Sequence, residues 1–315
     1  THGNLVHCFE RECSIQRRHQ KIIEEAPSPA VTEDIRERMG AAAIAAAKKL
    51  GYSSAGTVEF LLSGDEFWFL EVNARLQVEH PVTEEIIGKD LVREQIRVAE
   101  GEALSFSQDE LSIEGHAIEA RLYAENPEKN FLPSPGPVIA WEPSTIGRAR
   151  FDSGVETGSI ITTEFDPMIA KVTVHAPTRR EAAARLARVL ETTRIQGLTT
   201  NRDFLVNTLR TDEYISGDTT TDFIERVNPD RVIPKDQEAL QSAAMDAASA
   251  EPVLASVVIE DMDLVRRDGA STIDDKQQVA LAAFDRRFSS WEAAASGLLP
   301  WYSHDEGRVG SWRDG

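Results

Sequence analysis

The sequence is poor in cysteine and has no long apolar run. Its two cysteines, Cys8 and Cys13, cannot form a disulfide framework, and no Cys/His set has zinc-finger spacing. A reducing cytoplasm is therefore the expected compartment. No stretch approaches the roughly 20 apolar residues of a membrane helix, and the start lacks the pattern of a secretory signal. The chain does not begin with Met, and its early stretch NLVHCFE already looks like a strand. We therefore expect it to begin inside a longer protein.

Basic charge is also scarce, and this excludes a class of partner. The chain has 34 Lys and Arg against 53 Asp and Glu, for a net charge of −19. A phosphate backbone would be repelled, so nucleic acid is not an expected partner. Only 8 of the basic residues are Lys and 26 are Arg, and many acids with few lysines suggest a surface adapted to high salt. With 315 residues, 41% hydrophobic and 28% charged, the chain should form two or three soluble globular domains.

The first third of the chain predicts strands and helices in a mixed order. Residues 4–10 read as a strand, followed by a basic, polar loop, RECSIQRRHQK. An Ala-rich helix is expected over 33–50, with Thr32 as N-cap and Gly51 just past its end. Two strands follow, AGTVEFLLS and FWFLEVN, joined by a Gly-Asp turn. A second helix is expected over 90–100.

From residue 115 the pattern changes to strands followed by helices, which indicates an α+β domain. GHAIEARLYAE is a strand and FLPSPGP a rigid loop, and further strands are expected near 137–142, 148–152 and 165–175. Thr178 and Glu181 form a capping box that begins a helix running to about 195, and Gly197 stops it. A shorter helix begins after Asn201. After about 228 the pattern weakens.

FWFLEVNARLQVEHPVTEE, residues 67–85, carries the chemistry. Glu59 lies in the middle of the first hairpin strand and Glu71 in the middle of the second. A three-residue loop would place the two opposite each other, with Cβ atoms roughly 5 Å apart, whereas a two-residue loop would place Leu70 opposite Glu59. Adjacent carboxylates repel unless a cation lies between them, and Asn73 adds an amide oxygen on the same face. Such hard oxygen ligands suit Mg²⁺ or Mn²⁺ carrying nucleotide phosphates.

The residues beyond that amide extend the constellation. Arg75, Gln77 and Glu79 would continue the same face if the chain stays extended, until Pro81 ends the strand pairing. The site would then hold a metal ion, the fixed positive charge of Arg75 and the carboxylate of Glu79, one after another along the chain. Such an arrangement suits phosphoryl transfer followed by chemistry on a small anion. The plainer alternative is that the two strand carboxylates are the solvent face of a hairpin. Aromatic residues of the same parity argue against that alternative.

Several long motifs occur here in the order of a known family. FLEVNARLQVEHPVTE, together with CSIQRRHQKIIEEAPSP, closely resembles biotin carboxylase, an ATP-grasp enzyme. GHAIEARLYAENP, FLPSPG and EFDPMIAKV resemble its C-terminal domain, and the similarity runs from residue 1 to about 227. The resemblance implies an α+β fold: an ATP-grasp C-terminal lobe with an antiparallel sheet, plus a biotin carboxylase C-terminal domain. It divides the chain into the end of the lid with a linking strand (1–20), the ATP-grasp core (21–112), the C-terminal domain (113–227) and a linker or partner-docking tail (228–315).

Biotin carboxylase uses ATP to activate bicarbonate as carboxyphosphate and then carboxylates N1′ of biotin. By resemblance, Glu59 and Glu71 would bind the metal ions and ATP, with Asn73 alongside, while Gln16 and His19 would contact the nucleotide. Glu79 would be the base that deprotonates bicarbonate, in a pocket completed by Lys21, Arg75, Gln77 and the backbone at Val78. Arg75 would also stabilise the biotin enolate, a task that suits a fixed guanidinium. Arg121 would approach biotin and the bicarbonate.

Each of these roles has a plainer alternative. RRHQK could be a solvated basic loop, and His19 an ordinary surface histidine. Arg121 could pair with Glu119 or Glu125, a contact that contributes little if it is exposed. Cys13 could be a small buried residue rather than a nucleophile.

The chain also departs from the family. The N-terminal domain and nearly all of the lid, with its Gly-rich phosphate loop, have no counterpart, so we expect no ATP turnover by these residues alone. In the family the biotinylated lysine lies between two Met residues, and neither Met245 nor Met262 is followed by Lys. We therefore expect biotin to come from a separate carrier domain or from a stretch beyond Gly315. The expected partners are a biotin carboxyl carrier domain, a carboxyltransferase subunit, and a second copy bound through the C-terminal domain. Another ATP-grasp ligase and a non-catalytic dimerisation or scaffold module stay open as alternatives. The final acceptor, an acyl-CoA or pyruvate, is left open.

Overall fold

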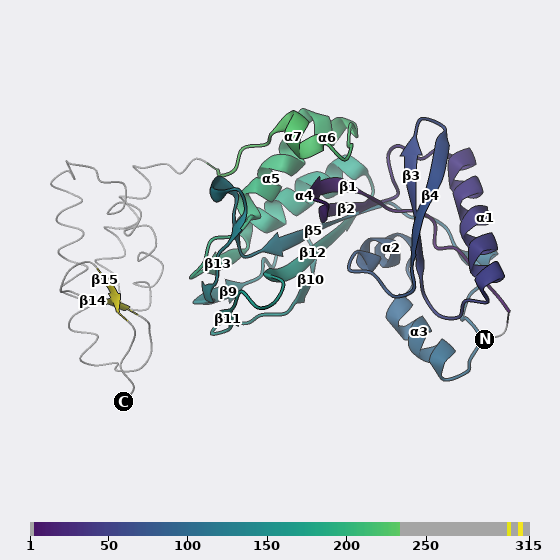
Figure 1. Ribbon diagram of the computed structural model, residues 1–315, viewed down its shortest axis with the longest axis horizontal. Helices are drawn as coiled ribbons and strands as arrows, with labels where there is room; N and C mark the ends of the chain where they lie inside the picture. Colours follow the sequence, from purple (N-terminus) through teal and green to yellow (C-terminus); the bar gives the residue numbers. More distant parts are fainter. Residues whose placement is uncertain (1–2, 234–300, 304–307, 311–315) are drawn as a thin grey trace. The chain divides into compact units, whose positions relative to one another are not determined.

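The computed structural model describes residues 3–233, 301–303 and 308–310 (Figure 1). The chain divides into two units after Ile233. In the second unit the described residues are two short antiparallel strands, β14 (Trp301–Ser303) and β15 (Arg308–Gly310). Most of the expected tail therefore lies outside the described residues. Within the described part, no helix is long and apolar enough to cross a membrane.

A five-stranded antiparallel sheet organises the first unit, in the order β1-β2-β5-β12-β10. Its strands are β1 (Glu12–Arg17), β2 (Gln20–Ala26), β5 (His116–Tyr123), β12 (Met168–Ala176) and β10 (Arg150–Ser153). The central strand β5 is buried along its whole length, so both of its faces are covered.

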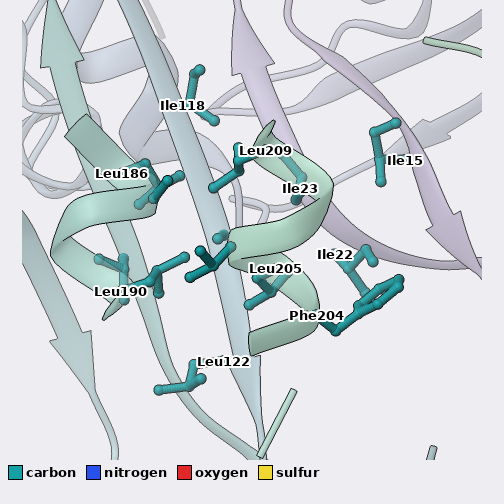
Figure 2. Packing of buried hydrophobic residues seen from close by; sticks show 14 of the residues in the cluster. Ile15, Ile22, Ile23, Ile118, Leu122, Leu186, Leu190, Phe204, Leu205 and Leu209 are labelled. Carbon is teal, nitrogen blue, oxygen red and sulfur yellow. The ribbon is translucent and has the colours of Figure 1, made fainter. Parts of the chain in front are cut away.

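The two faces of β5 are covered by different elements. Ile118 and Leu122 join the main hydrophobic core, which includes residues of α4 (Arg179–Thr192) and α5 (Arg202–Arg210) (Figure 2). On the other face, Ala117 packs in a second cluster with residues of α2 (His80–Ile87). Glu119 and Arg121 share the face of Ala117 because side chains alternate along a strand. Charged side chains buried there require partners.

The remaining elements surround this sheet. Helix α1 (Glu33–Leu50), the hairpin β3 (Thr57–Ser63) and β4 (Glu66–Asn73), and α3 (Leu91–Ala99) belong to the N-terminal part (Figure 1). The C-terminal part adds two-stranded ladders from β6 (Glu125–Asn126), β7 (Leu132–Pro133), β8 (Gly136–Pro137), β9 (Ala140–Glu142), β11 (Ile160–Ile161) and β13 (Arg194–Gln196). Short helices α6 (Asp212–Ser216) and α7 (Phe223–Val227) follow, and one-turn 3₁₀ helices span Gln108–Glu110 and Pro127–Lys129.

The predicted helix caps are confirmed. The Thr32 side chain accepts a hydrogen bond from the backbone N–H of Ile35, and Gly51 ends α1 in the left-handed conformation. Thr178 and Glu181 form the predicted capping box of α4.

The predicted strand over residues 4–10 is wrong. Within the described residues the segment pairs with no strand, and the backbone N–H and carbonyl of His7 bond instead to the side chain of Gln108 at 2.9 and 3.1 Å. The polar stretch RECSIQRRHQK, expected as a loop, instead forms β1, a tight turn and the start of β2. Arg18 and His19 form that turn with φ of 49° and 66°, the left-handed conformation of a two-residue hairpin loop.

Two further boundaries differ from expectation. Helix α4 ends at Thr192 rather than near 195, because residues 194–196 pair with β9, and Gly197 follows that strand instead of the helix. The chain also leaves the extended conformation after Asn73, so Pro81 does not end a strand. It lies in the first turn of α2, where its missing N–H costs no helical hydrogen bond.

Candidate active site

The β3–β4 hairpin places Glu59 opposite Glu71, as predicted, but by another route. Ser63 pairs with Glu66, so the loop has two residues, which alone would put Leu70 opposite Glu59. A β-bulge leaves Leu70 unpaired and restores the Glu59–Glu71 pair. The bulge breaks the strict alternation of side chains along β4, so residues of the same parity as Glu71 need not share its face. Phe69 is 61% exposed, so, contrary to expectation, the aromatic residues do not argue against a solvent-exposed hairpin face.

A single set of hydrogen bonds joins these acids to the following loop. Asn73 Nδ2 donates to Glu59 Oε1 at 3.1 Å and to Glu71 Oε1 at 2.9 Å, so the two carboxylates lie on one side of the hairpin. Glu59 Oε1 also accepts from Lys21 Nζ at 3.0 Å and from Gln77 Nε2 at 2.7 Å. Glu59 therefore links β2, the hairpin and the loop that follows β4 through hydrogen bonds.

Glu79 is the second centre of the site and is only 2% exposed. Its Oε1 accepts from Lys21 Nζ at 2.9 Å and its Oε2 from Arg121 Nη2 at 2.9 Å, while Arg11 Nη2 lies 3.7 Å from Oε1. Burial opposes ionisation of this carboxyl, but the charges of Arg11 and Lys21 outweigh it and lower the pKa of Glu79 to about 2. The side chain is therefore ionised throughout the physiological range.

Arg11 also belongs to this network, although the sequence pattern did not single it out. Its guanidinium donates to Gln77 Oε1 at 2.6 Å, to Thr57 Oγ1 at 3.1 Å and to Thr83 Oγ1 at 3.3 Å. It thereby ties β3, the loop and α2 together behind Glu79. The available signal was its position just before CSIQRRHQK, one of the segments that resemble the family.

Lys171 of β12 holds the loop from the other side. Its Nζ donates to the carbonyl of Val78 at 2.7 Å and lies 3.3 Å from Asp152. His80 Nδ1 lies 2.8 Å from the carbonyl of Gln77, a contact that further restricts the loop. Lys171 lies in the EFDPMIAKV segment, which carried no assigned role in the sequence reasoning.

Three predicted site residues are not joined to this network by any hydrogen bond within the described part. Arg75 is exposed and donates to the carbonyl of the next residue at 3.3 Å. Gln16 is paired with Lys21 in the β1–β2 ladder, on the same face, but bonds to the carbonyl of Cys13 at 2.9 Å. His19 is exposed at the turn. Burial raises the pKa of the Cys13 thiol to about 11, which supports the plainer reading of that residue.

The network opens onto a cavity of about 360 Å³. Its lining includes Arg11, Lys21, Glu59, Arg75 and Glu79, so Arg75 borders the same space as the buried network. Among the described residues, no group of three or more His, Cys, Asp or Glu side chains could hold a metal ion. A cation held by the two hairpin carboxylates would need further oxygen ligands.

Comparison with known proteins places these features in a family. Residues 1–107 match the family model "Carbamoyl-phosphate synthase L chain, ATP binding domain", and residues 119–226 match "Biotin carboxylase C-terminal domain". Biotin carboxylase 2 of Bacillus subtilis is 49% identical over 226 residues, which are 71% of this chain and 51% of that protein. The mitochondrial methylcrotonoyl-CoA carboxylase subunit alpha of Arabidopsis thaliana is 41% identical over 98% of this chain and 39% of its own length.

A solved structure shows the same fold. The biotin carboxylase domain of the Hydrogenobacter thermophilus 2-oxoglutarate carboxylase, in complex with MgADP, ADP and bicarbonate, matches with a TM-score of 0.71 and 41% identity. The match covers 74% of this chain and 52% of that one, so the chain spans about half the length of such relatives. The C-terminal match separates this chain from ATP-grasp enzymes that lack such a domain. Residues 1–107 therefore belong to that ATP-binding domain family, and residues 119–226 belong to the biotin carboxylase C-terminal domain family.

Proposed function

We propose that this chain supplies the metal-binding and proton-accepting side of a biotin carboxylase site, which uses ATP and bicarbonate to carboxylate carrier-bound biotin through carboxyphosphate. The observation that carries the proposal is the single hydrogen-bonded network around two acids, Glu59 and Glu79. The network joins seven of the residues expected from the sequence: Lys21, Glu59, Glu71, Asn73, Gln77, Glu79 and Arg121. The relatives named above support the reaction class.

The residues present fit a nucleotide-bound divalent cation. Glu59 and Glu71 offer facing carboxylates, and Mg²⁺ is held in proteins by one or two carboxylates together with substrate phosphates. Asn73 turns its amide nitrogen to both acids, and rotation of the amide would present its oxygen instead. When bound, Mg²⁺ or Mn²⁺ would neutralise charge on the transferring phosphoryl group. Gln16 and His19 would contact the nucleotide at the β1–β2 edge.

The loop residues would handle bicarbonate. Lys21, Arg75, Gln77 and the backbone N–H of Val78 would hold the anion, and Glu79 would accept its proton. A carboxylate whose pKa is about 2 is a weak base, so Glu79 needs activation. Bicarbonate drawn against Lys21 would divert positive charge away from Glu79 and raise its basicity. Arg75 would then be free to follow the carboxyl group to the biotin enolate.

The remaining assignments follow from the same proposal. Arg121 would approach biotin and bicarbonate, because its guanidinium already lies against Glu79. The chain would divide at residues 20, 112 and 227, as expected from the resemblance. A biotin carboxyl carrier domain and a carboxyltransferase subunit would be its partners in the cytoplasm. The C-terminal domain would form a homodimer, and one solved relative is described as a biotin carboxylase domain dimer.

The test measures ATP cleavage that depends on both biotin and bicarbonate, in the longest natural protein that contains these residues. Glu71→Gln should lower the rate roughly 100-fold or more, because a charged phosphate-and-metal contact is lost. Glu66→Gln is the matched control, since Glu66 is an exposed acid on the same strand. It should stay within about twofold of the unaltered protein. ATP cleavage without need of biotin would favour another ATP-grasp ligase, and indifference to Glu71 would favour a scaffold.

A further inference from the structure

Two glutamates lie side by side inside the central sheet, behind the proposed site. Glu24 of β2 is directly opposite Glu119 of β5, and Thr173 of β12 is opposite Glu119 on its other side. Both glutamates are 0% exposed. Residues opposite each other in an antiparallel ladder point to the same face, with Cβ atoms roughly 5 Å apart. The two carboxyl groups therefore share one buried space.

Each carboxyl group uses one oxygen and leaves the other without a partner. Glu24 Oε1 accepts from Arg121 Nε at 2.6 Å, and Glu119 Oε2 accepts from Thr173 Oγ1 at 2.8 Å. Glu24 Oε2 and Glu119 Oε1 are buried with no hydrogen-bond partner. A buried, unpaired carboxylate oxygen is strongly unfavourable.

The surrounding cations do not neutralise both acids. The charged and titratable groups that interact electrostatically with the pair are Arg121, Glu79, Lys21, Lys171, Tyr123, Cys13 and Tyr214. Of these, Arg121 is shared with Glu79, Lys21 bonds to Glu59 and Glu79, and Lys171 bonds to Val78 and pairs with Asp152. Burial, followed by the charge of Glu24, raises the pKa of Glu119 to about 8.

We propose that Glu119 is a neutral carboxylic acid at neutral pH, that it donates a hydrogen bond to Glu24, and that the pair positions Arg121. The proton on Glu119 Oε1 would bond to Glu24 Oε2, so both unpartnered oxygens would be satisfied together. Glu24 would then carry a single negative charge against the Nε of Arg121, whose Nη2 holds Glu79. Glu24 and Glu119 are positioning residues, because they reach the proposed site through Arg121. The positioning role rests on the proposed function, whereas the protonation of Glu119 does not.

Infrared difference spectroscopy of the full chain tests the protonation directly. At pH about 7 the unaltered protein should show a protonated-carboxyl C=O stretching band that Glu119→Gln removes. Glu25→Gln is the matched control: Glu25 is the next residue of β2 and is also buried, at 3% exposed, but it pairs with His116 and Arg179, which help to lower its pKa. That variant should leave the band unchanged. Absence of the band from the unaltered protein overturns the proposal whether or not Glu119→Gln folds.

Urea unfolding gives a second reading. A carboxyl group whose pKa is raised on folding binds more protons in the folded than in the unfolded state. Its contribution to the free energy of unfolding is therefore lost as the pH rises from about 4.5 to about 8. Glu119→Gln removes that loss, so its stability relative to the unaltered protein should increase over this range. A difference that is independent of pH would contradict a neutral Glu119. Neither this measurement nor the infrared one involves ATP or biotin, so failure here is distinct from failure of the proposed function.

The positioning role is tested by the pH profile of biotin carboxylation in the longest natural protein containing these residues. Ionisation of Glu119 would place a second negative charge beside Glu24 and draw Arg121 away from Glu79. The rate in the unaltered protein should therefore fall above pH about 8, and Glu119→Gln should abolish this fall. Identical profiles for the two proteins would overturn the positioning role.

Discussion

At the scale of single residues, neighbours rather than residue type decide the chemistry of this site. Glu24 and Glu79 are both buried glutamates that contact Arg121. Burial raises the pKa of Glu24, whereas Arg11 and Lys21, working against burial, lower the pKa of Glu79. Two carboxyl groups on one guanidinium thus have opposite shifts, a pattern typical of sites that separate proton-holding from proton-accepting roles.

The lowered pKa of Glu79 predicts a pH-dependent contribution to stability. A depressed carboxyl pKa stabilises the fold above the unfolded value of about 4.5, and this stability is lost as the pH falls toward about 2. Glu79→Gln should therefore lower the free energy of unfolding at pH 7 by about 2–3 kcal/mol, and the deficit should shrink as the pH falls. Urea unfolding between pH about 3 and 7 measures this difference. Glu85→Gln, at an exposed position of α2, the helix that Glu79 precedes, is the control, and a deficit constant with pH would refute the expectation.

At the scale of elements, the β3–β4 hairpin combines a short turn with a bulge to bring its acids together. The two-residue loop sets a register in which Glu59 would meet Leu70, and the bulge shifts that register by one residue. Leu70 is therefore the surplus residue of the strand, while Glu71 and Asn73 keep their two-residue spacing on one face.

Two deletions test this account of the hairpin. Removing Leu70 should give a regular ladder in which Glu71 still faces Glu59, so Mn²⁺ affinity in the presence of ADP should stay within about threefold. Removing Val72 instead places Asn73 on the opposite face from Glu71, and affinity should fall about tenfold or more. Mn²⁺ binding followed by electron paramagnetic resonance compares the two variants. Equal losses would show that the bulge itself, not the shared face, positions the acids.

At the scale of the whole molecule, acidic charge dominates. With a net charge of −19, the excess carboxylates repel one another in the folded protein, and salt screens this repulsion. Raising KCl from about 0.1 to about 1 M at pH 7 should increase the thermal midpoint by a few degrees. Near the isoelectric point of about 4.8 the net charge vanishes, so the same salt should give little change there. A stability maximum at low salt and pH 7 would count against a surface adapted to salt.

Local signals were sufficient wherever a feature depends on residues close together in the chain. The Thr32 and Gly51 caps, the capping box of α4 and the β3–β4 hairpin each depend on a few neighbouring residues, and each was predicted. The family resemblance was equally legible, because its motifs are contiguous. These features follow from backbone hydrogen bonding and side-chain periodicity, which a short stretch of sequence carries in full.

Only the tertiary structure decided which distant residues meet. Gln108 takes the backbone groups of His7 that a strand would have used, and β9 recruits residues 194–196 away from α4. In the same way, Glu119 meets Glu24 only because β5 lies beside β2. Such contacts depend on how the elements pack, and the resulting burial and neighbouring charges set each pKa. A local sequence pattern therefore could not predict these contacts or pKa shifts.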